Sequence, residues 1–176
     1  MRIIAGSAKG REILRPKTRA TRPMADKVRA AIFNILGPID GLKIADLYAG
    51  TGALGLEALS RGAGNVTGVE LGIVPAQTIE TNVANLGFNN RYSLVVKGVE
   101  NWLSESQEPF DIIFAHPPYK DFDFSVLDKV AERLTPKGLF IIELAKHQPP
   151  DDIAGLKLVS QRHYGQSAVS FYQKKG

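Results

Sequence analysis

Apolar and polar positions alternate in blocks along most of the chain after residue 40. Five short, nearly continuous apolar runs are predicted strands: 42–48, 65–70, 92–97, 110–115 and 138–144. Four segments between them carry apolar residues at helical spacing and are predicted helices: 53–61, 75–86, 99–105 and 122–134. Strands and helices that alternate in this way predict a parallel sheet with helices on both faces.

Both ends of the chain depart from this alternation. The runs 157–164 and 168–173 lie so close together that they predict a hairpin, and therefore an antiparallel strand. Near the start, 2–5 and 11–14 predict a second hairpin, and 24–36 predicts a helix that ends at Gly37-Pro38. We therefore predict an α/β protein with a seven-stranded, mostly parallel sheet. Residues 1–40 would form a small basic extension, and residues 41–176 the main domain.

The most informative motif is the sequence Asp-Leu-Tyr-Ala-Gly-Thr-Gly-Ala-Leu-Gly at residues 46–55. It follows a predicted strand and opens a helix, and its glycines let the backbone approach a ligand. The G-x-G-x-x-G spacing alone is a weak signal of dinucleotide binding. Asp46 adds specificity, because a carboxylate here would repel a pyrophosphate but attract a cationic group. The motif thus favours S-adenosylmethionine over NAD, and over a turn without a ligand; the predicted contacts are Asp46, Tyr48, Gly50, Gly52 and Leu54.

Two more strand ends supply candidate cofactor contacts. Glu70 ends the second strand, 18 residues after Gly52, where an acceptor for ribose hydroxyls is expected. Val99 and Glu100 follow the third strand, where an acidic side chain often contacts the adenine amino group. Val99 could only pack against the adenine face, and the orientation of Glu100 stays open at this point.

The fourth strand runs into His116-Pro117-Pro118-Tyr119. Two consecutive prolines make a rigid loop with carbonyl acceptors, and a neighbouring aromatic ring can stack on a base. The sequence resembles the [Asp/Asn/Ser]-Pro-Pro-[Tyr/Phe] motif of methyltransferases that modify exocyclic amino groups of nucleobases. A side-chain acceptor and the following carbonyl can bind both N–H groups of such an amine and orient its nitrogen. We predict that these four residues are catalytic, with a rigid structural turn as the alternative.

Composition limits the remaining possibilities. The chain has 176 residues, is 44% hydrophobic and contains no cysteine, so disulfides and thiolate metal sites are excluded. We find neither an apolar run near ~18 residues nor a secretory leader, and the three histidines are widely spaced. We expect a cytoplasmic monomer without a metal ion or a membrane span.

The charge is concentrated at the start of the chain. Residues 1–29 hold nine basic and two acidic residues, a net +7, so the rest of the chain carries −3 of the total +4. Basic side chains along one arm release counterions from a nucleic acid, which favours a phosphate-binding arm over an ordinary solvated face. The predicted RNA contacts are Lys9, Arg11, Arg15, Arg19, Arg22, Lys27 and Arg29.

Several stretches together resemble a single family over nearly the whole chain. They are Arg2-Ile-Ile-Ala-Gly6, Lys9-Gly10-Arg11, Thr21-Arg22-Pro23, Asp26-Lys-Val-Arg29, Phe33-Asn-Ile-Leu36, residues 46–63, Pro117-Pro-Tyr119 and Arg162-His-Tyr-Gly165. The chain is similar to the RsmD-like family of bacterial small-subunit rRNA guanine-N2 methyltransferases. This resemblance implies the class I, Rossmann-like methyltransferase fold, S-adenosylmethionine as cofactor, and guanine 966 of 16S rRNA as target. The partner would be free rRNA or the assembling 30S particle.

One departure from the family bears directly on activity. The family motif begins with Asp, whereas this chain has His116, and a neutral imidazole offers one acceptor nitrogen and no negative charge. Two functions therefore stay open: an active rRNA methyltransferase, or a cofactor-binding and rRNA-binding protein with reduced or lost catalysis. A dehydrogenase or a small-molecule methyltransferase is less favoured. Val99 and Gln166 are weaker departures at positions where the family often has Asp.

Overall fold

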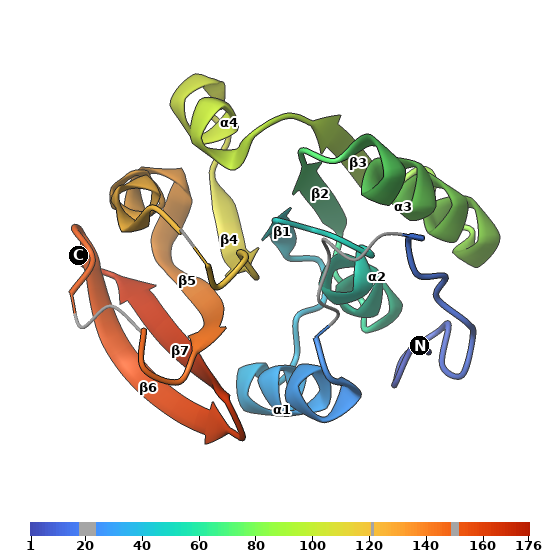
Figure 1. Cartoon of the computed structure of the whole chain (residues 1–176), viewed down its shortest axis with the longest axis horizontal. Helices are drawn as coiled ribbons and strands as arrows, with labels where there is room; N and C mark the ends of the chain where they lie inside the picture. The colour runs from blue at the N-terminus through green and yellow to red at the C-terminus, as the bar shows by residue number, and fades with distance from the viewer. Residues whose placement is uncertain (18–23, 121, 149–151) are drawn as a thin grey trace.

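The computed structural model describes residues 1–17, 24–120, 122–148 and 152–176. It contains one seven-stranded sheet flanked by helices (Figure 1). The strands are β1 (Lys43–Leu47), β2 (Asn65–Glu70), β3 (Tyr92–Val96), β4 (Phe110–Ala115), β5 (Leu134–Ala145), β6 (Leu156–Tyr164) and β7 (Ser167–Lys174). The helices are α1 (Asp26–Leu36), α2 (Ala53–Ser60), α3 (Ile73–Leu86) and α4 (Val99–Glu105), with 3-10 turns η1 (Phe124–Lys129) and η2 (Ala131–Arg133).

The strand order is β3-β2-β1-β4-β5-β7-β6. All neighbouring strands are parallel except for the pairs β5–β7 and β6–β7, which are antiparallel. The predicted mostly parallel sheet with a terminal hairpin is therefore confirmed. The chain proceeds outward from β1 to β3 and then returns to β4 on the other side of β1, so the order reverses between β1 and β4. Open α/β sheets bind ligands outside the carboxyl ends of the strands at such a point.

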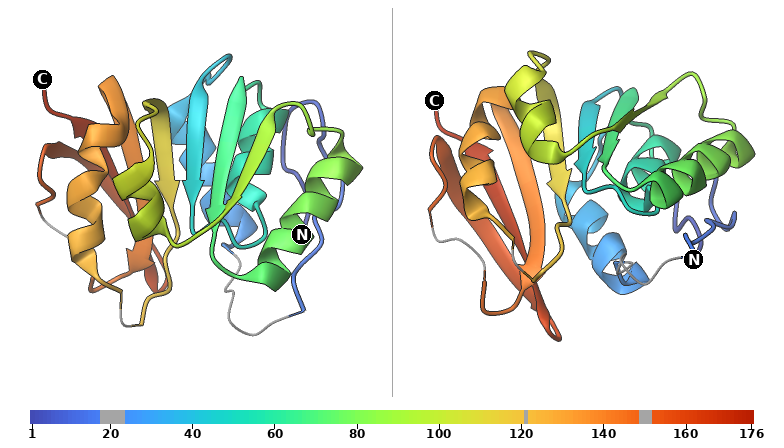
Figure 2. Two further views of the ribbon diagram at one scale, coloured as in Figure 1. Left: turned by 90° about the horizontal axis from the view of Figure 1, so that it is seen from above. Right: turned by 45° about the horizontal axis from the view of Figure 1, so that its top comes forward.

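Two hydrophobic layers explain why the strands are apolar along their whole length. Alternate side chains of a strand point to opposite faces, so Ile44 packs on the face with α1, α2 and α3, while Ala45 and Leu47 pack toward α4, η1 and η2. Helices lie on both sides of the sheet (Figure 2). Because both faces are buried, polar residues within the strands stand out as candidates for function.

The predicted helix at 122–134 is wrong. This segment forms the two short 3-10 turns η1 and η2, and β5 begins at Leu134 rather than at residue 138. Leu134 pairs with Phe110, and a register shift between Phe110 and Ile112 accommodates the extra length of β5. Early pairing with β4 thus ends the helical segment, which a local pattern of apolar residues does not reveal. The other predicted strands and helices of the main domain agree to within a few residues.

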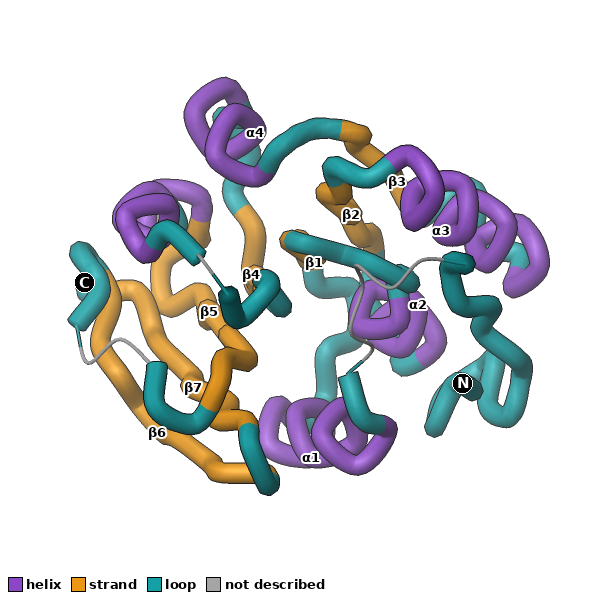
Figure 3. Tube along the Cα trace, viewed as in Figure 1, coloured by secondary structure: helices purple, strands orange, loops and turns teal. Residues whose placement is uncertain are grey.

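The predicted N-terminal hairpin is present in a minimal form, with one antiparallel bridge between Arg2 and Glu12, and Figure 3 shows this segment as loop. Its two arms are joined by backbone hydrogen bonds of 2.9 Å, from the N–H of Ile3 to the carbonyl of Arg11 and from the N–H of Ile13 to the carbonyl of Met1. Its backbone also pairs with α2. The N–H groups of Ile4 and Ala5 donate to the buried Glu57 carboxylate at 2.8 and 3.0 Å. The extension also contributes to the same hydrophobic cluster as α2 and α3, because Ile13 is fully buried there. The start of the chain is therefore attached along the main domain.

In the described ranges, no helix combines the length and the apolar character that crossing a membrane requires.

Candidate active site

A cavity of about 740 Å³ opens at the carboxyl ends of the central strands, where the strand order reverses. The predicted site residues that line it are Asp46, Tyr48, Gly50, Leu54, Glu70, Val99, His116, Pro117, Pro118 and Tyr119. Met24, Thr51, Leu71 and Lys120 line it as well, although the sequence did not single them out. The backbone N–H of His116 donates to the carbonyl of Leu47 at 3.3 Å, which joins the loops after β1 and β4. Both predicted motifs thus face one enclosed space of a size typical for a small ligand.

The glycine loop has an unusual backbone. Gly50 and Gly52 have φ of 57° and 74°, and Tyr48, which is not a glycine, has φ of 58°. A side chain in this left-handed region costs of order ~1–3 kcal/mol, and such strain is concentrated at functional sites. Gly52 is not among the residues that line the cavity, so its predicted contact with a ligand stays a prediction. It precedes α2 and packs against Ile79, where an added Cβ would lie 3.3 Å from the side chain.

Asp46 is 1% exposed, at the end of β1. Its Oδ2 accepts a hydrogen bond of 3.0 Å from the N–H of Gly55. Burial raises the pKa of Asp46 to about 7, the Gly55 hydrogen bond opposes this, and the charge of Glu70 adds to it. A cationic ligand group nearby would restore the ionised form, so this carboxylate suits a cation.

Glu70 holds two loops in place. Its Oε2 accepts from the N–H of Gly50 at 2.8 Å, and its Oε1 accepts from the N–H of Gly72 at 2.7 Å. Each carboxylate oxygen can accept more than one hydrogen bond, so these contacts leave capacity for ligand hydroxyls. Glu70 is therefore part of the loop architecture as well as of the cavity wall.

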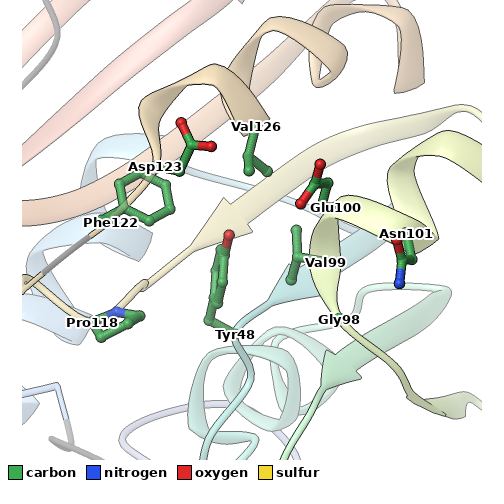
Figure 4. Close-up of a pocket in the computed structure, with 9 residues that line it drawn as sticks. All are labelled: Tyr48, Gly98, Val99, Glu100, Asn101, Pro118, Phe122, Asp123 and Val126. Carbon is green, nitrogen blue, oxygen red and sulfur yellow. The ribbon is translucent and has the colours of Figure 1, made fainter.

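Val99 lines the main cavity, but Glu100 does not. Glu100 lies in an adjoining hollow of about 280 Å³, which shares Tyr48, Val99 and Pro118 with the main cavity (Figure 4). The side chains of Val99 and Glu100 point in different directions because both residues begin α4, and consecutive helical side chains diverge by roughly 100°. The Tyr48 ring lies between Val99 and Phe122 in this view, and its pKa is raised to about 12 by burial and then by Asp123 and Glu100.

The loop after β4 packs against a residue that sequence reasoning missed. Nε2 of His116 lies 3.3 Å from Oε2 of Glu143, which is 5% exposed on β5. The rings of His116 and Tyr119 lie edge to face, with centroids 6.3 Å apart. The carbonyl of Tyr119 accepts from Gln148 Nε2 at 3.0 Å. An acidic residue near the end of the apolar run 139–145 was the available signal for Glu143.

Asn82 is a second residue that the sequence did not reveal. It is fully buried on α3, and its amide donates to the carbonyls of Leu14 and Thr51 at 3.1 and 3.2 Å. Its Oδ1 also accepts from the N–H of Leu14 at 2.8 Å. One side chain thus connects the extension, α3 and the glycine loop.

The residues predicted to contact RNA differ in their exposure to solvent. Lys9, Arg11, Arg15 and Lys27 are exposed, while Arg19 and Arg22 lie outside the described residues. The Arg11 guanidinium donates to the carbonyls of Asn85 and Leu86, which caps the end of α3.

The prediction that Arg29 contacts RNA is wrong, because its side chain is 0% exposed. It lies 3.2 Å from Asp26 and 3.6 Å from Glu57, and it donates to the carbonyl of Arg2 at 2.6 Å. Burial lowers the pKa of Arg29, and the two carboxylates oppose that shift. Its charge is used inside the molecule to attach the extension.

The described residues contain no group of three or more His, Cys, Asp or Glu side chains that could hold a metal ion. A mostly parallel seven-stranded sheet with a terminal antiparallel hairpin, and a glycine loop at its switch point, is the class I methyltransferase fold.

Comparisons with known proteins are consistent with this class. A model of the family described as Conserved hypothetical protein 95 matches residues 1–173. The Bacillus subtilis (strain 168) protein named Putative rRNA methyltransferase YlbH is 33% identical, with 100% of both chains covered. Ribosomal RNA small subunit methyltransferase D of Escherichia coli (strain K12) is 31% identical over 99% of this chain and 90% of its own.

A solved structure described as Putative methyltransferase yhhF from Escherichia coli superposes with a TM-score of 0.89. It is 30% identical and covers 99% of this chain and 98% of its own. The chain therefore belongs to the Conserved hypothetical protein 95 family, which confirms the RsmD-like family indicated by the sequence motifs.

Proposed function

We propose that this protein is an rRNA methyltransferase that transfers a methyl group from S-adenosylmethionine to the exocyclic N2 of a guanine in small-subunit rRNA. The names of two full-length relatives describe rRNA methyltransferases. The observation that carries the proposal is the single cavity shared by the acidic glycine loop and the His116-Pro117-Pro118-Tyr119 loop. Guanine 966 is the target that the family resemblance implies.

The acidic end of the cavity suits the cofactor. S-adenosylmethionine supplies an electrophilic methyl group when bound. Asp46 is a buried carboxyl group whose pKa is raised by burial, and a nearby amino group or sulfonium would stabilise its ionised form. Glu70 presents acceptors for ribose hydroxyls, and Leu71 and Val99 supply apolar surface for a purine.

The other end of the cavity suits a nucleobase amine. Pro117 is buried, so its carbonyl is held rigidly beside His116, and the two groups can accept the N–H bonds of one amine. Tyr119 is half-buried at the cavity wall, where its ring can stack on a flipped base. This chain thereby aligns the amine nitrogen with a methyl donor bound over the glycine loop.

A second candidate function rests on His116 itself. A histidine in place of the family aspartate favours a protein that binds cofactor and rRNA with little catalysis. Cofactor and RNA affinities would be the same in both cases, so only a turnover measurement separates the two.

The deciding experiment supplies the purified protein with radiolabelled S-adenosylmethionine and either undermethylated small subunits or free 16S rRNA. We expect label in N2-methylguanosine after nuclease digestion, and loss of that label when guanine 966 is substituted. Tyr119→Ala should slow the reaction by roughly 5- to 150-fold, the loss of ~1–3 kcal/mol of stacking, with unchanged affinity for S-adenosylhomocysteine. Cofactor binding without any transfer would favour the second candidate, and tighter binding of NAD would overturn both.

A further inference from the structure

The most informative polar contact in the cavity wall is the pair formed by His116 and Glu143. Ala115 of β4 lies opposite Ile142 of β5, so the next residues, His116 and Glu143, adjoin one another on the same face of the sheet. Their facing atoms, Nε2 and Oε2, are 3.3 Å apart. Glu143 lies in an apolar strand and is 5% exposed, whereas His116 is 15% exposed and lines the cavity.

The buried carboxylate of Glu143 destabilises the folded protein unless a hydrogen-bond donor faces it. Its Oε2 is buried and, among the described residues, receives no hydrogen bond of regular geometry. Nε2 of the His116 imidazole faces this oxygen at 3.3 Å. Burying an ionised carboxylate oxygen without a donor is far more costly than burying a neutral polar group in the same way. A proton on Nε2 of His116 would relieve that cost, and a lone pair on Nε2 would increase it.

We propose that Glu143 is a positioning residue that selects the His116 tautomer with its proton on Nε2 and its lone pair on Nδ1. The two ring nitrogens are distinct, and the group bound to one determines the state of the other. This inference rests on the proposed function, because it explains how a histidine replaces the family aspartate as the acceptor for the guanine amine.

The pair of His116 and Glu143 also explains where the excess proton of the methylated amine goes and what stabilises the positive charge that results. As guanine N2 forms its bond to the methyl carbon, the electron pair of the broken carbon–sulfur bond stays on sulfur, and the methylated N2 carries an excess proton. That proton passes to Nδ1 of His116, and Glu143 stabilises the imidazolium that results. A buried aspartate stabilises the catalytic histidine of serine proteases in the same way. Glu143 supplies the negative charge that the family has at position 116.

The first test reads the tautomer directly and needs no turnover. The protein has three histidines, so ¹⁵N NMR of histidine-labelled protein can be assigned with His147→Gln and His163→Gln. At pH 8 we expect His116 to be protonated on Nε2 in the parent and to become a mixture of tautomers in Glu143→Met. An unchanged tautomer in that variant, or a parent protonated on Nδ1, would overturn the proposal.

The second test is a double-mutant cycle on single-turnover methylation. Glu143→Met should slow the parent by roughly 10- to 100-fold, the usual size of a positioning effect. In a His116→Asp background the same change should be neutral or favourable, because it removes a carboxylate beside another carboxylate. Equal losses in both backgrounds would show a structural role only and would overturn the proposal.

A conservative variant covers the case in which Glu143→Met does not fold. Glu143→Gln keeps an acceptor but loses the charge, so we expect the parent tautomer with a reduced rate. A full rate in Glu143→Gln would overturn the charge stabilisation. If the parent methylates no rRNA, the proposed function fails, and the NMR readout still decides the tautomer.

Discussion

Asp46 is a buried carboxyl group whose ionisation lowers the stability of the folded protein. Its folded-state pKa of about 7 lies above the unfolded value near ~3.9, so its favourable contribution is fully present below ~3.9 and is lost as the pH rises through about 7. Asp46→Asn should therefore raise the free energy of unfolding of the cofactor-free protein by about 1–3 kcal/mol more at pH 8 than at pH 5, because the loss of stability between ~3.9 and about 7 is only partly complete at pH 5. Urea unfolding at both pH values measures this, with the exposed Asp128→Asn as control.

The same residue predicts how cofactor affinity depends on pH. If the Asp46 carboxylate binds a cationic group, the affinity for S-adenosylhomocysteine should fall as the pH drops below about 7, by up to ~10-fold per unit. In Asp46→Asn the affinity should be weaker and nearly independent of pH between 5.5 and 8. Calorimetry can measure both proteins, and an identical pH profile would remove Asp46 from the binding site.

At the scale of elements, α3 is the connection between the extension and the glycine loop. Asn82→Ala would leave the partly buried N–H and carbonyl of Leu14 and the buried carbonyl of Thr51 without the Asn82 side chain as partner. Each unsatisfied group costs about 1–3 kcal/mol, so thermal unfolding should occur at a clearly lower temperature and cofactor affinity should fall. Asn85→Ala is the matched control, because Asn85 lies on the exposed side of the same helix. Equal effects of the two changes would contradict the connecting role of Asn82.

Another element-scale connection is α2, whose Glu57 binds the extension. This residue accepts from the backbone of Ile4 and Ala5 and pairs with Arg29 and Arg61. The positive charge of Arg29 therefore contributes to the attachment of the chain start, and variants of Arg29 would unfold the protein rather than report on RNA.

At the scale of the whole molecule, exposed basic residues of the N-terminal extension are a better test of RNA binding than Arg29. Arg15 and Lys27 are both exposed, and Lys27 follows three residues after Met24, which lines the cavity. Arg15→Gln with Lys27→Gln should weaken rRNA binding and make the slope of log affinity against log salt shallower by roughly 0.7–0.9 per lost phosphate contact. Cofactor affinity should not change.

The control carries the same loss of charge at a different place. Lys157 and Lys175 are exposed near the start of β6 and the end of β7, at the edge of the sheet opposite the cavity. Lys157→Gln with Lys175→Gln should leave the salt slope unchanged. Two double variants with equal slopes would mean that the basic segment is only a solvated face.

Local sequence patterns are enough to predict the fold class, the alternation of strands and helices, and the two loops that line the cavity. Apolar strands buried on both faces leave a strong local pattern, and the glycine loop and the Pro-Pro loop depend on residues adjacent in the chain. These features could be predicted because their causes lie within short segments. The segment 122–134 could not, since its conformation depends on where β5 pairs with β4.

The partners of the charged residues, by contrast, depend on tertiary contacts. Arg29 looks like an RNA contact in the sequence, yet it is buried against Glu57. Glu143 looks like an ordinary strand residue, yet it lies beside His116. The physical reason is that folding brings together residues that are far apart in the chain, such as Arg29 with Glu57 and His116 with Glu143. No local sequence pattern indicates which carboxylate will lie beside which basic side chain.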